Sequence, residues 1–422
     1  MTVSGSAAAP GPGASLALAA MYALTIVGFP LVSTVPVLFG LDSQAVTLPY
    51  RAGVAALVLG IIFGWWMRGE HILFSWPVRL TLILWVLLVA RMFYDTLVNP
   101  LPGEFGMPAG QILLLSLGAC FLPAVVFLET PSTATLDLAR RGIEIVGMVT
   151  MLLILYLGLR GVFDGRILRR LATAVLNPIS VGHLGVSVFI VALCGLAGSG
   201  FLAKVFRWLL ILTSVIVIVA SASRGPILAA LMVAVVYSFV RRRKRSLALG
   251  ALLFRLALLA AVIAAVVPAI NYLEEEGYIS LMERFSETLE DVAAQERIAM
   301  AIGAWTQFTD HPLFGSAFVE LRYYTYPHNI VLESLMATGV VGAGLLLANL
   351  AAAILASMRL ILASPSVAWI GFIVLQYVVH GMVSGSLYLD GAFWAYGFGA
   401  LVVARSLERY GAGARVPVPA VV

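Results

Sequence analysis

Long apolar blocks recur from one end of this sequence to the other and constrain its fold more than any other feature. Most blocks run for about 18 to 25 residues, the length that a helix needs to cross a hydrocarbon layer roughly 30 Å thick. Charged residues make up only 11% of the chain, whereas a water-soluble domain has about 25%. With so few charges, the chain cannot cover a surface that faces water. We therefore expect an all-α, polytopic protein embedded in a lipid bilayer.

About twelve transmembrane helices are expected. Their predicted ranges are 15–40, 48–67, 76–94, 108–129, 142–160, 174–197, 203–221, 224–240, 247–269, 328–357, 366–387 and 391–407. The expected organisation is a disordered leader at 1–14, helices 1–9 within 15–269, an external loop at 270–327, helices 10–12 within 328–407 and a cytoplasmic tail at 408–422. The leader is rich in Ala, Gly, Pro and Ser and lacks the basic start of a signal peptide.

The distribution of basic residues predicts which loops face the cytoplasm. Arg241–Arg245 form the densest basic run, and Lys204 with Arg207 and the tail at 405–409 fall on the same side of the predicted topology. An even helix count then places both termini in the cytoplasm. The loop Arg160–Arg170 is an exception, because parity sends its arginines outside. Either one helix is miscounted, or an external basic patch holds phosphate.

The long loop at 270–327 has the pattern of two amphipathic helices that lie on the membrane surface. Apolar residues recur at helical spacing in two sets: Leu281, Phe285 and Leu289, then Ile298, Ala301, Trp305 and Phe308. The pair His311-Pro312 ends the second helix. Tyr323, Tyr324 and Tyr326 precede the next membrane helix, where aromatic rings favour the interface.

Arg224 lies in a break between two apolar helices, within the sequence Ser221-Ala222-Ser223-Arg224-Gly225-Pro226. Pro226 suits the first turn of a helix and Gly225 permits a sharp reversal, so the next helix directs its free amides at this spot. An arginine beside a helix N-terminus is typical of an anion site. The alternative is an interfacial arginine that only ends the preceding helix.

Three further ionisable residues lie at or near the end of the external loop. Arg297 is either an anion-binding residue or the surface partner of Glu296 or Asp291. His328 could accept a proton from a hydroxyl near neutral pH, or it could be a structural interface residue. Glu333 follows within two helical turns, and we expect it to pair with an Arg, Tyr or His side chain, because a lone carboxylate is costly at that depth.

Together these residues suit displacement at a sugar phosphate. Guanidinium groups neutralise a diphosphate leaving group, and one base activates the attacking hydroxyl. The sequence shows no Asp-rich metal site, and Cys120 and Cys194 lie inside apolar blocks, where they predict neither a disulfide nor a metal cluster. We therefore expect no metal, no cofactor and no nucleic-acid partner.

Four ordered segments resemble the O-antigen ligase and polymerase family of bacterial envelope enzymes. They are Glu296–Trp305, Asp310–Gly315 with its HPLFG sequence, Pro327–Glu333 with PHN, and Thr338–Gly342 with TGVVG; Ser223–Pro226 extends the resemblance. It implies transfer of a glycan from undecaprenyl diphosphate to a sugar hydroxyl on the periplasmic face of the inner membrane. It further implies that Arg224 and Arg297 bind the diphosphate and that His328 activates the acceptor.

Other substrate contacts are expected from Asn329, Glu333 and Tyr324, and from Arg166, Arg169 and Arg170 if their loop is external.

The acceptor decides between two activities of this family. A ligase uses lipid A core, whereas a polymerase joins two lipid-linked repeats. His328-Asn329 followed by Gly339 looks like the ligase form, although Gly342 stands where ligases are expected to have threonine. Polymerases often carry an arginine that is followed eleven positions later by a glycine. Neither Arg224 nor Arg297 is followed by a glycine at that distance. A lipid-linked glycan transporter is the alternative from another class, but the sequence lacks the internal repeat typical of transporters.

Overall fold

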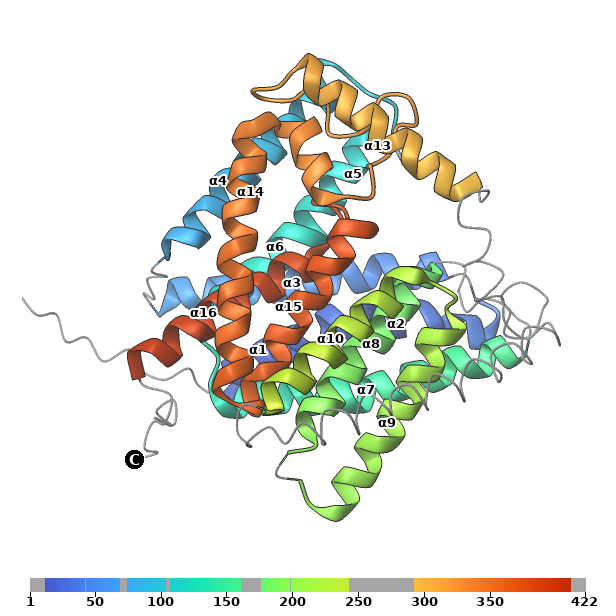
Figure 1. Ribbon diagram of the computed structural model, residues 1–422, viewed down its shortest axis with the longest axis vertical. Helices are drawn as coiled ribbons and strands as arrows, with labels where there is room; N and C mark the ends of the chain where they lie inside the picture. The colour runs from blue at the N-terminus through green and yellow to red at the C-terminus, as the bar shows by residue number, and fades with distance from the viewer. Residues whose placement is uncertain are drawn as a thin grey trace, which may run out of the picture. The chain divides into compact units, whose positions relative to one another are not determined.

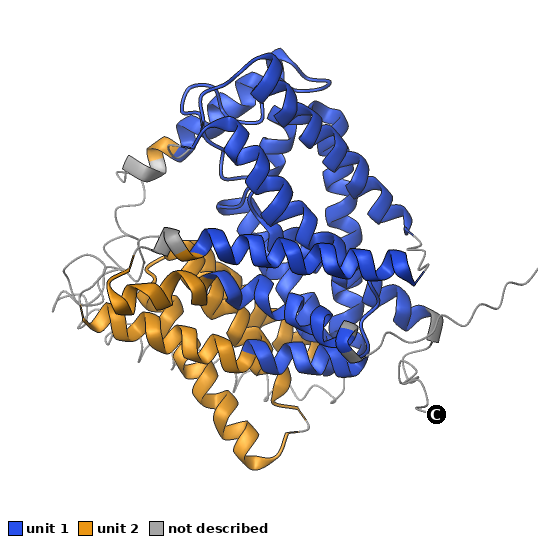
Figure 2. Ribbon diagram, turned by 180° about the vertical axis from the view of Figure 1, so that it is seen from behind, with its two compact units in different colours: residues 1–29, 47–143, 297–422 blue, residues 30–46, 144–296 orange. Residues whose placement is uncertain are grey.

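The computed structural model describes residues 12–41, 43–68, 74–103, 107–160, 176–197, 199–242 and 292–410. Within these ranges the regular secondary structure is helical, joined by turns and loops, apart from one isolated β-bridge between Glu320 and Thr325 (Figure 1). The chain divides into two compact units, coloured separately in Figure 2. Unit 1 comprises residues 1–29, 47–143 and 297–422, and unit 2 comprises residues 30–46 and 144–296.

The helices of unit 1 begin and end as follows. They are α1 (Pro12–Ala23), η1 (Leu24–Gly28), most of α3 (Ser43–Met67), α4 (Trp76–Phe93), η3 (Tyr94–Val98), α5 (Ala109–Leu115), η4 (Ser116–Phe121), α6 (Leu122–Val125), η5 (Val126–Leu128), most of α13 (Val292–Asp310), α14 (Ile330–Ala363), α15 (Pro365–Val383) and α16 (Gly391–Tyr410). Unit 2 holds most of α2 (Phe29–Thr34), then η2 (Val35–Phe39), most of α7 (Thr133–Leu159), α8 (Pro178–Gly195), α9 (Phe201–Ala220) and α10 (Arg224–Arg242).

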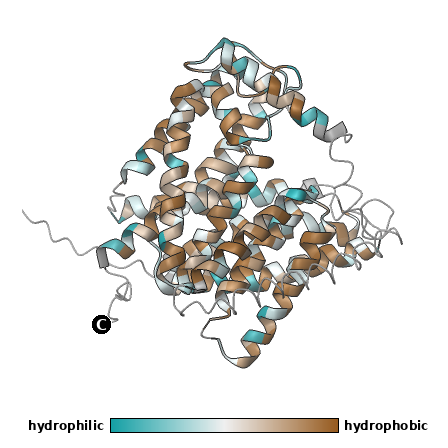
Figure 3. Cartoon of the chain, in the orientation of Figure 1, coloured by the Kyte–Doolittle hydropathy of each residue, from teal (hydrophilic) through white to brown (hydrophobic). Residues whose placement is uncertain are grey.

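Nine of the predicted spans coincide with helices that are long and apolar enough to cross a membrane in the described part of the chain. Of the other three, 224–240 lies in a shorter apolar helix and 391–407 lies in α16, which is not among those nine. Range 247–269 lies outside the described residues. Figure 3 shows hydrophobic residues along most of α14 and α15 and more hydrophilic ones around α13. The fold is thus an all-helical, multi-pass membrane fold, and the total of twelve stays a prediction.

Several helix boundaries differ from the prediction, and those of α7, α14 and α15 have clear local causes. Helix α7 begins at Thr133 rather than at 142, because Ser132 accepts a hydrogen bond from the Thr135 amide and caps the helix nine residues earlier. Helix α14 continues past 357 to Ala363, since Arg359 points out of the helix without breaking it. Helix α15 ends at Val383 rather than at 387, where the chain turns.

A cluster of buried aromatic rings forms the core of unit 1. Tyr22 contacts Phe127 with ring centroids 4.3 Å apart, and the Tyr396 ring lies 5.7 Å from that of Tyr22 and 6.0 Å from that of Trp369. The Tyr396 hydroxyl donates to the Tyr22 carbonyl at 2.6 Å, so its polar atom is paired inside the core. Helix α14 packs against α4, α15 and α16 beside this cluster.

In unit 2 a buried ion pair ties α9 to α7. The Arg207 guanidinium donates to both carboxylate oxygens of Glu144, at 2.8 and 3.2 Å, and to the Gly195 carbonyl at 2.8 Å. Arg207 is only 7% exposed. The predicted topology places this arginine at the cytoplasmic side, which stays a prediction. Its burial against Glu144 shows that it contributes to packing inside the unit.

Helix α14 is broken at Gly339, which has φ +63° and a non-helical ψ of −161°. The break leaves backbone groups without helical partners, and the loop after α13 supplies them: the Ser316 amide donates to the Met336 carbonyl at 2.9 Å and the Val340 amide donates to the Pro312 carbonyl at 2.8 Å. Backbone and backbone meet so closely that a β-carbon on Gly339 would lie 2.3 Å from the Leu313 carbonyl. The HPLFG and TGVVG segments therefore pack directly against each other through their backbones.

Candidate functional site

The N-terminus of α14 carries His328 and Asn329. The Asn329 side-chain oxygen accepts from the amides of Val331 and Leu332, each at 3.0 Å, and caps the helix. Its side-chain nitrogen donates to the Met382 carbonyl at 3.0 Å, which joins α14 to the end of α15. His328 itself has φ +57°, a left-handed conformation that is rare for a non-glycine residue. Strain of this kind is held in place by the cap that follows.

His328 is half-buried beside aromatic rings. Its ring lies 4.5 Å from that of Tyr326, edge to face, and Tyr326 in turn lies 6.3 Å from Tyr388. The imidazole Nδ1 is buried, and no hydrogen-bond partner for it exists in the described part of the chain. One ring nitrogen is therefore left for a partner that the described residues do not provide.

The surroundings of His328 lower its pKa to about 4. Burial is the largest cause, the positive charge of Arg297 is the next, and His380 contributes in the same direction. A hydrogen bond to the Ser384 backbone opposes them. At physiological pH the imidazole is consequently neutral and holds a lone pair that can accept a proton.

Arg297 lies near the start of α13 and its side chain is exposed. No ion pair joins it to Glu296, which was one of the two surface partners considered from the sequence; the other, Asp291, lies outside the described residues. Its charge nevertheless acts on His328. An exposed guanidinium beside a neutral imidazole suits binding of an anion next to a base.

Glu333 is fully buried in the first turn of α14. Its carboxylate accepts from the Ser386 hydroxyl at 3.0 Å and from the Leu387 amide, at 3.0 Å to one oxygen and 2.9 Å to the other. These contacts hold the turn between α15 and α16 against the base of the site. The Arg, Tyr or His partner expected from the sequence stays a prediction.

The same turn brings together two residues that sequence reasoning missed, His380 and Asp390. The His380 Nε2 lies 3.5 Å from the Asp390 Oδ2, while Asp390 also accepts from the Phe393 amide at 3.3 Å and so caps α16. Burial raises the pKa of Asp390, and the charge of His380 lowers it in opposition. The rule that marks ionisable groups within apolar helices would have found His380. The preference for a carboxylate at the residue just before a helix would have identified Asp390.

Arg91 on α4 fixes the loop that enters the break in α14. Its guanidinium donates to the carbonyls of Ser316 and Gly315 at 2.8 and 3.1 Å, and it lies 3.5 Å from Asp95. Asp95 is fully buried and accepts from the Phe318 amide at 2.8 Å. This pair therefore holds the loop that contains HPLFG against the end of α4.

Tyr324 lies in a tight turn that follows this loop. It has φ +53°, and its amide donates to the Glu320 carbonyl at 2.7 Å. The buried Glu320 side chain accepts from the amides of Arg322 and Tyr323 at 3.0 and 2.8 Å and shapes the turn. Tyr324 itself is 36% exposed, as a residue that contacts a substrate would be.

Arg224 is the first residue of α10 in unit 2, where it is half-buried. The chain reverses just before it, but the left-handed residue is Ala222, with φ +47°, and not Gly225. The expectation that Gly225 makes the reversal was wrong. Glycine is needed instead at position 182, where an added β-carbon would lie 2.5 Å from Pro226. Pro226 does lie in the first turn of α10, as predicted.

The structure thus brings Arg297, Tyr324, His328, Asn329 and Glu333 into one unit, and Arg224 belongs to the other. Arg166, Arg169 and Arg170 lie outside the described residues, as does the first amphipathic helix predicted around residues 281–289. The second amphipathic helix is α13, which ends at Asp310 as the His311-Pro312 pair predicted.

Fold and site together define a multi-pass membrane protein with a neutral histidine, an exposed arginine and a strained helix start at one end of the longest described helix. Residues 209–347 match the family described as O-antigen ligase, a family of glycosyltransferase-like membrane enzymes. The match covers about a third of the chain and confirms the resemblance seen in its motifs. Arg224, Arg297 and His328 all lie inside it. No curated protein matches the chain.

Proposed function

We propose that this protein is an O-antigen ligase. It transfers a glycan from undecaprenyl diphosphate to a sugar hydroxyl of lipid A core, on the periplasmic face of the bacterial inner membrane and without a metal ion. The observation that carries the proposal is the neutral His328. Its buried Nδ1 has no hydrogen-bond partner among the described residues, and the charge of Arg297 lowers its pKa. The family match supports glycan transfer in a membrane.

In the proposed reaction, His328 takes the proton from the acceptor hydroxyl while the acceptor oxygen attacks the anomeric carbon. The bond from that carbon to the diphosphate oxygen breaks, and undecaprenyl diphosphate leaves with the electron pair. Arg224 and Arg297 neutralise the charge that develops on it. One direct displacement inverts the anomeric centre. The proton remains on the imidazole until the product departs.

The low pKa of His328 gives this mechanism an order of events. A diphosphate bound at Arg297 cancels one of the charges that lower the histidine pKa, so the imidazole becomes a stronger base only when the donor is in place. In the empty site the imidazole is therefore a weak base, and binding of the donor prepares it for the acceptor hydroxyl.

A reconstituted transfer reaction tests the proposal. Purified protein is given a polyprenyl-diphosphate-linked glycan together with lipid A core or with a second lipid-linked repeat, in the presence of a chelator. We expect glycan on lipid A core, reduced by at least about a hundredfold in His328→Ala. His311→Ala is the matched control, since this second histidine is exposed at the end of α13.

Each alternative has its own outcome in the same reaction. Elongation of the lipid-linked glycan would make the protein a polymerase, with the same base and the same leaving group but a different acceptor. No transfer to either acceptor would contradict an enzymatic role and favour a transporter of lipid-linked glycan. Product linkage determined by NMR tests the stereochemistry, and retention would contradict direct displacement.

A further inference from the structure

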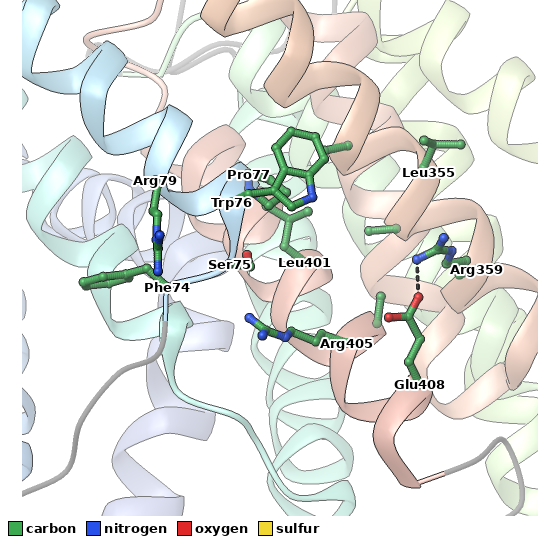
Figure 4. Close-up of a pocket in the computed structure, with 13 residues that line it drawn as sticks. Phe74, Ser75, Trp76, Pro77, Arg79, Leu355, Arg359, Leu401, Arg405 and Glu408 are labelled. Atoms are coloured by element: carbon green, nitrogen blue, oxygen red, sulfur yellow. Dashed lines mark hydrogen bonds and ion pairs between the residues drawn. The ribbon is translucent and has the colours of Figure 1, made fainter.

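A pocket of about 530 Å³ lies in unit 1, at the other end of α14 from His328. Its walls come from the start of α4, the second half of α14 and the last turns of α16 (Figure 4). Helix α14 is broken at Gly339, and at 1.5 Å per residue the stretch from there to Arg359 is roughly 30 Å long, comparable to the thickness of the hydrocarbon layer. The pocket therefore lies across that layer from the break at Gly339 and the loop at 312–316 that fills it.

Three arginines line this pocket and only one carboxylate does. Arg359 forms an ion pair with Glu408, drawn as a dashed line in Figure 4. Arg79 and Arg405 have no ion pair and no side-chain hydrogen bond with any described residue. Figure 4 shows Arg405 extending from α16 toward the wall where Arg79 lies. Two like charges that face one pocket repel each other unless an anion lies between them.

The pocket has the shape and lining to take a phosphate group on a lipid. Small side chains on its walls, among them Ala352, Ala356 and Ala404, leave room for a headgroup. Trp76 and Leu355 stand at its rim and are 64% and 61% exposed, which suits contact with acyl chains. Tryptophan is favoured at the level of the headgroups.

We propose that Arg79 and Arg405 bind the headgroup phosphate of an anionic phospholipid in this pocket, with Trp76 and Leu355 against its acyl chains. The charge pattern of the sequence assigns this end of α14 to the cytoplasmic side, where anionic lipids gather and basic pockets between helices hold their headgroups. The site is separate from the glycan transfer, and its occupant is a lipid of the membrane itself.

Native mass spectrometry of the full-length protein in detergent tests this site. Phosphatidylglycerol is titrated against phosphatidylcholine with the same acyl chains. We expect phosphatidylglycerol to bind about tenfold more tightly, and Arg79→Gln with Arg405→Gln to reduce it to the level of phosphatidylcholine. Arg322→Gln, an exposed arginine of the same unit, is the control and leaves the preference unchanged.

Three results would overturn the proposal. Equal binding of the two lipids by the unaltered protein would show that the anionic headgroup is not recognised. An undiminished preference in the double glutamine variant would show that the lipid binds elsewhere. Displacement of phosphatidylglycerol by millimolar inorganic phosphate would indicate a site for a free anion. If the double variant fails to fold, Arg79→Lys with Arg405→Lys keeps the charge, and we expect it to retain most of the preference. None of these results depends on glycan transfer.

Discussion

His328 is held neutral by burial and by a neighbouring cation, two effects that act in the same direction. Its folded-state pKa of about 4 lies below its ordinary value of 6.5. Between these two values the unfolded chain binds more protons than the folded protein, so stability is retained above pH 6.5 and falls as the pH drops toward 4. The same titration decides when the imidazole can act as a base.

Removing the cation should raise the pKa of His328. In Arg297→Gln, the imidazole loses the second-largest cause of its low pKa, and we expect it to become protonated at a higher pH than in the unaltered protein. Diethyl pyrocarbonate reacts with neutral imidazole, so the rate of His328 modification against pH, followed by peptide mass spectrometry, reports the pKa without requiring activity. An unchanged profile would mean that Arg297 does not act on this histidine.

Glu333 offers a second test at the scale of one side chain. Glu333→Ala leaves the Leu387 amide without its acceptor in a buried place, which costs about 1–3 kcal/mol. Glu333→Gln keeps one acceptor oxygen, and we expect a smaller loss. Thermal unfolding in detergent measures both. An alanine variant as stable as the unaltered protein would show that the carboxylate does not hold the turn between α15 and α16.

Among the elements, α14 contributes to most of the features described above. Its N-terminus presents His328, its break at Gly339 receives the loop that Arg91 clamps, and its far end lines the arginine pocket. The break separates the first turns, which carry the site, from the long remainder that crosses the membrane. The Met336 carbonyl and the Val340 amide beside the break pair with the backbone of Ser316 and Pro312.

A β-carbon at the break should be destabilising. Gly339→Ala forces an alanine to φ +63° and pushes its methyl group against the Leu313 carbonyl, and we expect a loss of about 1–3 kcal/mol with a lower unfolding temperature. Gly344→Ala is the matched control in the same helix, because nothing lies within 4 Å of the added carbon there. Equal effects of the two substitutions would contradict a role for the backbone contact.

At the scale of the whole molecule, the outward-facing surface is itself apolar. Large hydrophobic side chains such as Trp66, Leu202 and Leu212 are more than half exposed, as expected where lipid replaces water. The charge pattern predicts that the end of α13 faces the periplasm and that the connection between α14 and α15 faces the cytoplasm.

Single cysteines test this orientation. Both native cysteines are buried, so an introduced thiol dominates the reaction. We expect Asp310→Cys, at the end of α13, to react with an impermeant maleimide in spheroplasts, and Ser366→Cys, at the start of α15, to react only after lysis. The reverse pattern would invert the predicted topology, and labelling of both in intact spheroplasts would mean that α14 does not cross the bilayer.

Much of this protein follows from the sequence alone. The length of its apolar blocks predicted nine of the helices that are suited to span a membrane, and the HPLFG, PHN and TGVVG segments pointed to the family that residues 209–347 match. These features are local, because hydrophobic length and short motifs depend on neighbouring residues. The roles of Arg224, Arg297 and His328 remain predictions that came from the same motifs.

The tertiary structure decided the rest, because those features depend on residues far apart in the chain. Glu333 meets Leu387, His380 meets Asp390, and the loop at 312–316 fills the break at Gly339 only once the helices pack. Arg207 could not be told from a surface charge until its partner Glu144 was known. Likewise, the arginine pocket exists only where α4, α14 and α16 converge, and no stretch of sequence contains it.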